Sequence, residues 1–353
     1  MAAGGVMAQT AEEVAALVNS GRAHFEAGEY EAAASDFQQA LAKDPESAEA
    51  LCGLGAVYLK QGALDQAGGA LRQAVSLNPG LAAAHNDLGV YFLEVGQPDL
   101  AARQLEAAVD LAPDNLASRF NLGLAYLAAK QWTKAVEALT TARDRGLDNA
   151  DVHYALGKAL VEAGQAGAGV AEFEAAVQRD PSNVSARVAL ARALLQTGQV
   201  EQAVQALHEA LAVDPHSRAA WEELPGALAA SGTPAETLAA LQEKASAGAD
   251  DAAAQLECGL FAMHENLLQA AEPYLARAAE LDGENPVAWA ALGWAYVIEE
   301  KWEPAVGALE KAVAGAPDDP ALVVNLALAY FHTGQESEYE LSLIHISEPT
   351  RPY

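Results

Sequence analysis

Glycine recurs in this chain at a fixed interval of 34 residues. The glycines of this column are Gly21, Gly55, Gly89, Gly123, Gly157, Gly259 and Gly293, while Ala191 and Pro225 occupy two further sites of the same column. A period of this length is typical of proteins that stack one small structural unit many times. Because each unit of such a stack contacts only its neighbours, the 353 residues are expected to form one array and not two or three globular domains.

Each period has room for two helices. The units begin at Val14, Ala48, Ala82, Leu116, Ala150, Val184, Arg218, Ala252, Pro286 and Pro320. In the unit that begins at Leu116, Leu122, Gly123 and Tyr126 follow the spacing of one helix face. Most units then carry glycine, and one carries Asn266, where a first helix would end in the left-handed conformation. These glycines are Gly28, Gly62, Gly96, Gly164, Gly198, Gly232 and Gly334.

The second helix of each unit combines a column of large apolar residues with columns of alanine. The large column is Phe37, Leu71, Leu105, Leu139, Phe173, Leu207, Leu241, Leu275 and Leu309. Small residues let two helices approach closely, and large ones fill the space beside them. Prolines such as Pro45 end the second helix, and the neighbouring aspartates are expected to cap the helix that follows. These aspartates are Asp44, Asp114 and Asp180.

The repeating columns resemble the tetratricopeptide repeat. The matching residues are the Leu-Gly pairs that end at Gly55, Gly89, Gly123, Gly157 and Gly293, the aromatic residues Tyr58, Phe92, Tyr126, Tyr296 and Tyr330, Trp221 and Trp289 at an earlier aromatic site, the alanine columns and the closing prolines. The resemblance covers residue 14 to about residue 340. It implies an all-α fold, a right-handed superhelical solenoid of antiparallel helix pairs with about ten units, the last one truncated. It also implies that the first helix of each pair lines a concave groove where peptide partners lie.

The columns divide the chain into segments. Residues 1–13 are a lead-in whose Thr10-Ala-Glu-Glu13 reads as a capping box for the first helix. Residues 14–217 hold units one to six, and residues 252–340 hold units eight to ten. Residues 218–251 form a degenerate unit whose first helix is expected to kink near Pro225 or to begin after it. This unit is either a soft joint between two rigid stacks or a divergent repeat with ordinary packing.

Residues 341–353 fit no column and resemble the translation of a sequencing adapter, so we interpret them as a non-native tail. The tenth unit then lacks its second helix, which would leave Val323, Leu326 and Tyr330 uncovered. Native arrays usually end in a polar capping element. We therefore expect an exposed apolar C-terminal end that favours self-association. At the other end of the chain, Met7 is an alternative start to Met1.

The charge balance is strongly acidic, with 20 Lys and Arg residues against 49 Asp and Glu residues and a net charge of −29. Neither nucleic acid nor a membrane surface is an expected partner, since both are bound through clustered cations. Cys52 and Cys258 form no disulfide or zinc pattern, and we find no signal peptide or membrane-spanning run. These features favour a cytoplasmic location, and the alanine-rich, lysine-poor composition favours a bacterial origin.

The sequence contains no set of residues that indicates catalysis, a cofactor or a metal. His264-Glu265 lacks a second histidine four residues later, and the glycine-rich segment 164–169 lacks the Lys-Ser/Thr of a phosphate loop. His85 and His153 fall in the aromatic column of the first helices and are expected to be packed side chains. We therefore predict that the chain is not an enzyme.

The groove sites carry the functional prediction. The cations at these sites are Arg22, Lys60, Lys158 and Arg192, and the last two occupy the same site in adjacent units. Because cations are scarce here, this pair favours an acidic ligand or a C-terminal carboxylate, unless Glu162 neutralises Lys158. The apolar groove sites include Phe120, Leu124, Leu256, Leu260, Trp294 and Phe331. They suit an apolar peptide or an amphipathic helix, or alternatively they pack the superhelix.

The main hypothesis is a non-enzymatic scaffold that binds partner peptides or helices in its groove. One alternative is the recognition arm of a larger enzyme, such as a glycosyltransferase, kinase or protease, whose catalytic domain lies beyond the truncated C-terminus. A second alternative is an assembly factor for a membrane or secretion complex.

The carboxylate clamp of some family members is not matched, since Cys52 and Ala56 occupy its sites in one unit. The asparagine ladder of another branch of the family is matched only by Asn121 and Asn325.

Overall fold

The computed structural model describes residues 2–335 and 337–339, with side chains from Ala11 onward. The described residues form nineteen α-helices and a further helical turn at 337–339, and they contain no strand. The helices are α1 (Ala2–Glu26), α2 (Tyr30–Lys43), α3 (Ala48–Lys60), α4 (Leu64–Leu77), α5 (Ala82–Glu94), α6 (Pro98–Leu111), α7 (Leu116–Ala128), α8 (Trp132–Asp144), α9 (Ala150–Glu162), α10 (Ala166–Arg179), α11 (Val184–Gln196), α12 (Val200–Val213), α13 (Arg218–Ser231), α14 (Pro234–Ala247), α15 (Ala252–His264), α16 (Leu268–Leu281), α17 (Pro286–Ile298), α18 (Trp302–Gly315) and α19 (Pro320–Thr333).

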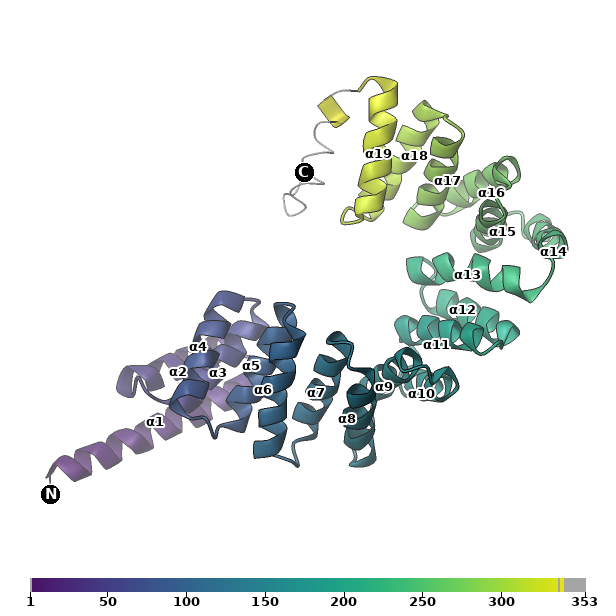
Figure 1. Ribbon diagram of the computed structural model, residues 1–353. Helices are drawn as coiled ribbons and strands as arrows, with labels where there is room; N and C mark the ends of the chain where they lie inside the picture. The colour runs from purple at the N-terminus through teal and green to yellow at the C-terminus, as the bar shows by residue number, and fades with distance from the viewer. Residues whose placement is uncertain (1, 336, 340–353) are drawn as a thin grey trace. The chain divides into compact units, whose positions relative to one another are not determined.

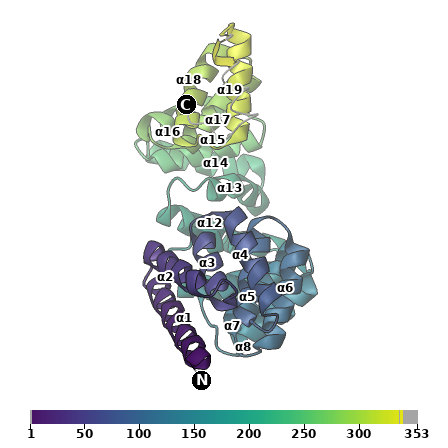
Figure 2. The same ribbon diagram turned by 90° about the vertical axis from the view of Figure 1, so that its left-hand side faces the viewer.

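These helices form two compact units. The first unit, Met1–Arg179, holds α1 to α10, and the second, Asp180–Tyr353, holds α11 to α19. Within the first unit, helices joined by short turns pack as successive antiparallel pairs, as α5 with α6 and α7 with α8 show (Figures 1 and 2). From α3 onward, every first helix begins at the residue where its 34-residue unit begins in the sequence. The predicted all-α array of helix pairs is therefore confirmed.

Helix starts differ from the prediction in two respects. α1 begins at Ala2, so Thr10 lies inside this helix and is not its first cap. The side chains that cap α3, α7 and α11 are Ser47, Asn115 and Asn183, and not the predicted Asp44, Asp114 and Asp180. Each cap accepts a hydrogen bond from the backbone N–H three residues later. The aspartates lie one to three residues before the caps and do not occupy the capping position.

The glycine column marks the closest approach between the two helices of a pair. A Cβ atom added at Gly123 would lie 2.5 Å from Cγ of Leu139, which is fully buried. The same relation joins Gly21 to Phe37, Gly55 to Leu71, Gly89 to Leu105, Gly157 to Phe173, Gly259 to Leu275 and Gly293 to Leu309. Real Cβ atoms do not approach a neighbour so closely. The glycine column and the large apolar column therefore interlock, as the sequence predicts.

The turn between the two helices of a pair is built on one left-handed residue. The residues at this site with positive φ are Gly28, Gly62, Gly96, Lys130, Gly164, Gly198, Asn266, Glu300 and Gly334. Gly232, in the degenerate unit, is the exception, since its φ of −170° is extended. Lys130 and Glu300 each have a φ of 56° and adopt this conformation despite their Cβ atoms. The turn geometry is therefore fixed by the fold, and glycine is the residue that meets it without strain.

We expect Glu300→Gly to stabilise the protein by about 1 kcal/mol, because glycine removes the steric penalty of the left-handed conformation. Gly62→Ala is the matched reverse change, since Gly62 has a φ of +71° and no atom within 4 Å of an added Cβ. It should cost a similar amount. Urea unfolding followed by circular dichroism measures both effects, and a Glu300→Gly protein less stable than its parent would contradict this account.

A second column closes the turns that join successive pairs. In five of the described first helices, a side-chain nitrogen in the first turn donates to the backbone carbonyl six residues earlier. The pairs are His85 with Pro79, Arg119 with Pro113, Arg187 with Pro181, Trp221 with Pro215 and Trp289 with Gly283. His85 and His153 are buried, as predicted for packed side chains. In His153 the two ring nitrogens instead lie 2.6 Å from carboxylate oxygens of Asp148 and Glu172.

The degenerate unit departs from this packing. α13 begins at Arg218 and runs through the buried Pro225, so a start after Pro225 is wrong. In the other pairs, a glycine or Ala191 at this site lets the second helix approach. Here the proline ring takes that space, and α13 makes few contacts with α14. It packs instead on α12 and α15, and it contacts α15 more extensively than other successive first helices contact one another. Whether residues 218–251 act as a soft joint stays a prediction.

Polar contacts hold this region of the second unit together. Glu257 on α15 is only 4% exposed. It pairs with Lys244 of α14 at 2.5 Å and with His208 of α12 at 2.9 Å. The turn before α13 also reaches later repeats, since His216 lies 2.9 Å from Asp282 and Arg218 pairs with Asp319, the cap of α19. Where the usual packing against α13 is missing, α14 thus packs on α15 and is linked to it through the ion pair of Lys244 with the buried Glu257.

The end of the array differs from its prediction. Val323, Leu326 and Tyr330 are buried, with Val323 1% exposed, because they pack against α18. The expectation that these three residues are uncovered is therefore wrong. The exposed apolar side chains of α19 are Val324, Leu328 and Phe331, on another face of the helix. The tail assigned to residues 341–353 lies outside the described residues.

Candidate partner-binding surfaces

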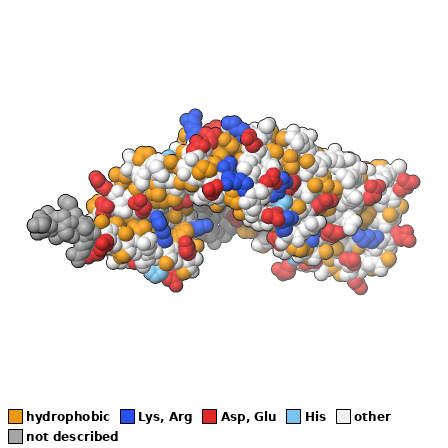
Figure 3. Space-filling model, turned by 90° about the horizontal axis from the view of Figure 1, so that it is seen from below, with side chains coloured by type: hydrophobic (Ala, Val, Ile, Leu, Met, Phe, Trp, Pro, Cys, Tyr) orange, Lys and Arg blue, Asp and Glu red, His pale blue; other side chains and the backbone are white. Residues whose placement is uncertain are grey.

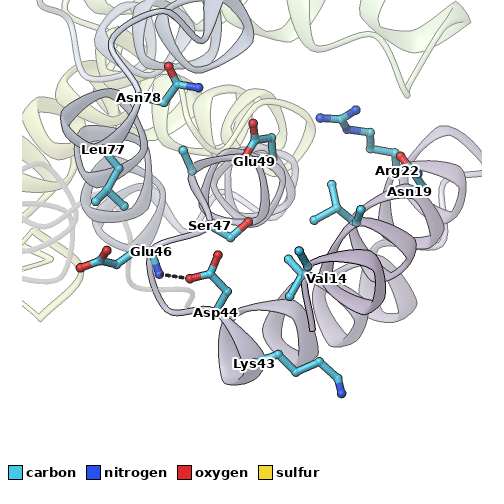
Figure 4. Close-up of a pocket in the computed structure, with 14 residues that line it drawn as sticks. Val14, Asn19, Arg22, Lys43, Asp44, Glu46, Ser47, Glu49, Leu77 and Asn78 are labelled. Atoms are coloured by element: carbon cyan, nitrogen blue, oxygen red, sulfur yellow. Dashed lines mark hydrogen bonds between the residues drawn. The ribbon is translucent and has the colours of Figure 1, made fainter. Parts of the chain in front are cut away.

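The first helices of the first unit line a hollow at its N-terminal end. This cavity of about 950 Å³ lies between α1, the start of α3 and the turn after α4. Figure 4 shows Val14 and Arg22 on α1, Ser47 and Glu49 on the α3 side, and Asn78 beyond them. The predicted groove residue Arg22 therefore lines a real depression. Its guanidinium is exposed and takes part in no ion pair within the described part of the chain.

A polar chain crosses the neighbouring first helices. Asn121 of α7 donates to Asn86 of α5 at 3.0 Å, and Asn86 donates to Asp87 at 3.0 Å. The thiol of Cys52 on α3 lies 3.5 Å from Asp87, and burial raises the pKa of this carboxyl above its usual value. The sequence prediction did not include Asp87 and did not connect Asn86 with Asn121. The signal was the 35-residue spacing of the two asparagines, which is one more than the repeat.

A second depression lies further along the first unit, between α7, the start of α8 and α9. Its volume is about 330 Å³, and Leu124, Leu127, Trp132 and Tyr154 supply apolar walls. Lys130, Lys158 and Glu162 supply its charges. The structure thus brings together Leu124 and Lys158, two residues that the sequence assigned to the groove. Lys158 is exposed and forms no ion pair within the described residues, while Glu162, one turn further along α9, lines the same depression. Whether Glu162 reduces the charge that Lys158 offers to a ligand stays a prediction.

Three further predicted residues have other surroundings. Lys60 is exposed at the end of α3, and Phe120 is half-buried against the core that α5 and α7 share. Arg192 belongs to the second unit, where it donates to Glu223 of α13 at 2.8 Å. Its charge is therefore engaged, whereas that of Lys158 in the first unit is not. The predicted pairing of Lys158 with Arg192 stays a prediction.

The second unit exposes an apolar surface on α17 and α19. We define the apolar face as Trp294, Ile298, Val324, Leu328 and Phe331, which are between 40% and 61% exposed. Trp294 and Phe331 were predicted as groove residues, and both lie on this face. Leu260 on α15 is half-buried, and Leu256, also predicted for the groove, is 1% exposed and belongs to the core. Leu256 is buried because α13 packs directly on α15.

On the rest of the surface, side chains of opposite charge are mixed. On the face seen in Figure 3, Lys and Arg side chains lie close to Asp and Glu side chains. Among the residues that the structure describes, no group of three or more His, Cys, Asp or Glu side chains is arranged to hold a metal ion. Within the same residues, every helix is too short or too polar to cross a membrane.

The fold defines a class, the α-helical repeat proteins built from stacked helix pairs. Residues 18–82, 86–150 and 126–184 match a family model described as tetratricopeptide repeat, and residues 160–224 match a second model with the same description. The chain belongs to the tetratricopeptide repeat family. Arrays of this family are protein-interaction scaffolds, and that is the general function the family gives to this chain.

Solved structures support the same fold. The structure of PilF from Pseudomonas aeruginosa is 20% identical, covers 61% of this chain and 97% of its own, and has a TM-score of 0.53. That of PilW, described as a widely conserved type IV pilus biogenesis factor, is 18% identical, covers 60% of this chain and 98% of its own, and has a TM-score of 0.54. A search of the curated proteins found no match. At these identities the similarity shows a shared fold.

Proposed function

We propose that this protein is a non-enzymatic scaffold that binds a partner peptide along the first helices of its first unit. The depression between α7 and α9 is the centre of this site. The observation that carries the proposal is an exposed Lys158 that forms no ion pair within the described residues and lines a pocket with aromatic and aliphatic walls. A scarce cation that its own protein leaves unpaired is available to a ligand.

The chemistry of the pocket favours a peptide with an apolar side chain next to a carboxylate. Trp132, Tyr154 and Leu127 offer apolar area for the side chain. Lys158 and Lys130 offer charge-assisted hydrogen bonds to the carboxylate, which is either an acidic side chain or a chain terminus. Glu162 is the one acid of this lining, and it disfavours ligands whose anionic group would lie at that end of α9.

Charge reversal at Lys158 tests this proposal. We expect Lys158→Glu to weaken binding of peptides with a free C-terminal or side-chain carboxylate by about tenfold or more, as expected for a lost charge-assisted contact. A peptide array in which each sequence is present with a free and an amidated C-terminus measures the effect and separates the two carboxylate sources.

Arg103→Glu is the matched control. Arg103 is an exposed cation on the second helix α6 of the same unit and makes no ion pair within the described chain. Its reversal changes the net charge equally and should leave binding unchanged. If both variants lose binding equally, attraction is a property of net charge and the pocket is not the site.

The proposal also includes a reducing, cytoplasmic setting. It is supported by the two cysteines, which are free and buried. Burial raises the pKa of the Cys258 thiol to about 11, so the reactive thiolate form is disfavoured at neutral pH.

A further inference from the structure

The apolar face of the second unit is the feature that the pocket on α9 does not explain. Trp294 and Ile298 are one turn apart on α17, and Val324, Leu328 and Phe331 follow the same spacing on α19. α17 and α19 contact each other, so the two stripes are adjacent. Phe331 is 61% exposed and Trp294 is 49% exposed. Large residues exposed together in this way mark an interaction surface more often than scattered single residues do.

The arrangement selects a helical occupant. Two parallel stripes of apolar side chains, separated by the gap between neighbouring helices, fit the ridge of a third helix that carries apolar residues at every third or fourth position. The face itself carries no charged side chain. An occupant therefore needs an apolar stripe of similar length, and its polar residues lie outside that stripe.

Charge decides among the helices that fit. The turn that follows Ile298 is acidic, with Glu299 and Glu300, and Glu303 follows in α18. The cations nearest in sequence are engaged elsewhere. Lys301 pairs with Glu272 at 2.5 Å and with Glu299 at 2.9 Å, and Lys311 lies 3.7 Å from the centre of the Trp289 ring. Next to the face, carboxylates such as that of Glu300 therefore form no ion pair within the part of the chain that the structure describes, and they favour a basic partner.

The same charge disfavours a second copy of this chain as the occupant. Each copy carries a net charge of −29, so two copies would repel one another at any shared face. A basic helix, in contrast, is attracted by the negative charge of this chain.

We propose that the apolar face on α17 and α19 binds an amphipathic helix whose polar side is basic. This inference rests on the proposed scaffold function and adds a second site with a different ligand chemistry. The first unit would take a carboxylate-bearing peptide, and the second unit would take a cationic helix. One chain would thereby hold two partners of opposite charge.

The test uses the full chain and three fluorescent peptides of about 18 residues, a length sufficient for a helix to form on binding. The first has leucine at helical spacing with lysine elsewhere, the second keeps the leucines and replaces lysine by glutamate, and the third scrambles the first. We expect the leucine-lysine helix to bind about tenfold or more tightly than either of the others in fluorescence anisotropy.

Trp294→Ser and Phe331→Ser should each weaken that binding by about tenfold, because each removes a large apolar contact from the centre of the face. Leu111→Ser and Val213→Ser are matched controls, since these residues are 46% and 43% exposed on α6 and α12, which are not part of the face. Circular dichroism should show that all four variants are folded. Lys158→Glu should bind the basic helix normally, which separates this proposal from the one for the first unit.

Four results would overturn the proposal. Equal binding of the glutamate peptide would show that charge does not select the occupant. Binding that survives Trp294→Ser and Phe331→Ser would show attraction to acidic surface elsewhere. A dimer in sedimentation that Phe331→Ser abolishes would make a second copy the occupant. Binding that requires deletion of residues 340–353 would make the chain's own tail the occupant.

Discussion

Gly123→Leu is expected to destabilise the protein by about 3 kcal/mol, since overpacking of a dense interior costs up to this amount. The leucine side chain would have to occupy space that Leu139 already fills, because even a Cβ at this position would lie 2.5 Å from Cγ of Leu139. Neither helix can move away without losing the buried contacts of the adjoining pairs. Equilibrium unfolding in urea, followed by circular dichroism at 222 nm, measures the change.

Gly69→Leu is the matched control for this prediction. Gly69 lies in α4 of the same unit, is exposed, and has no atom within 4 Å of an added Cβ. Here leucine should stabilise the protein by about 0.5 kcal/mol, because it is a better helix former than glycine. Leu139→Ala should reduce the destabilisation caused by Gly123→Leu and should leave the stabilisation by Gly69→Leu unchanged. Similar losses at both glycines would show that helix propensity, and not the interlocked columns, governs these positions.

The regular part of the fold was predictable because its physical requirements repeat. The site of Gly123 must hold a small residue in every unit, because a large residue such as Leu139 packs against it. The site of Gly62 must be left-handed in every unit, because a first helix ends there. Each requirement therefore leaves a column in the sequence. A column of ten sites is informative even when a single site is not. This is why, from α3 onward, the starts of the first helices coincide with the unit starts inferred from the sequence.

The degenerate unit was harder to predict because contacts between residues far apart in the sequence replace the usual packing of its two helices. Pro225 could be recognised as disruptive, but the sequence gives no periodic signal that Glu257 would be buried between His208 and Lys244. Contacts that occur once, such as Arg218 with Asp319, leave no column. The same reason explains why Asp87 was missed, and why repeat position did not decide between groove and core for Leu256, which is buried.

Functional sites were only partly predictable. Repeat position predicted which side chains face a groove, and two of them, Leu124 and Lys158, line one pocket. Position alone did not reveal whether a cation is free or engaged. Arg192 is bound to Glu223, whereas Lys158 has no partner within the described structure. The distinction depends on which acid lies opposite, and that is a property of packing between helices.

Removing both partners of Glu257 should produce the second large effect. In a Lys244→Ala, His208→Ala double variant, the carboxylate would stay buried on α15 without a counter-charge. We expect a loss of about 3 kcal/mol near pH 7, at the lower end for a broken buried pair because the Lys244 side chain is half exposed. Replacing Glu257 by leucine in the same background should recover much of the loss. No recovery would show that α14 is held by packing and not by this cluster.

The pH dependence follows from the same cluster. Burial alone would raise the pKa of Glu257, but the hydrogen bonds from His208 and Lys244 outweigh burial and lower the pKa below its ordinary value of 4.5. A carboxyl whose pKa is lower in the folded state binds fewer protons there than in the unfolded state. Its contribution to stability is therefore present above pH 4.5 and is lost as the pH falls through the folded value. Urea midpoints measured between neutral and acidic pH should fall more steeply for the parent protein than for Glu257→Gln. The difference arises because only the parent has this carboxylate to protonate, so parallel curves would show that the ion pairs of α14 contribute nothing to its acid sensitivity.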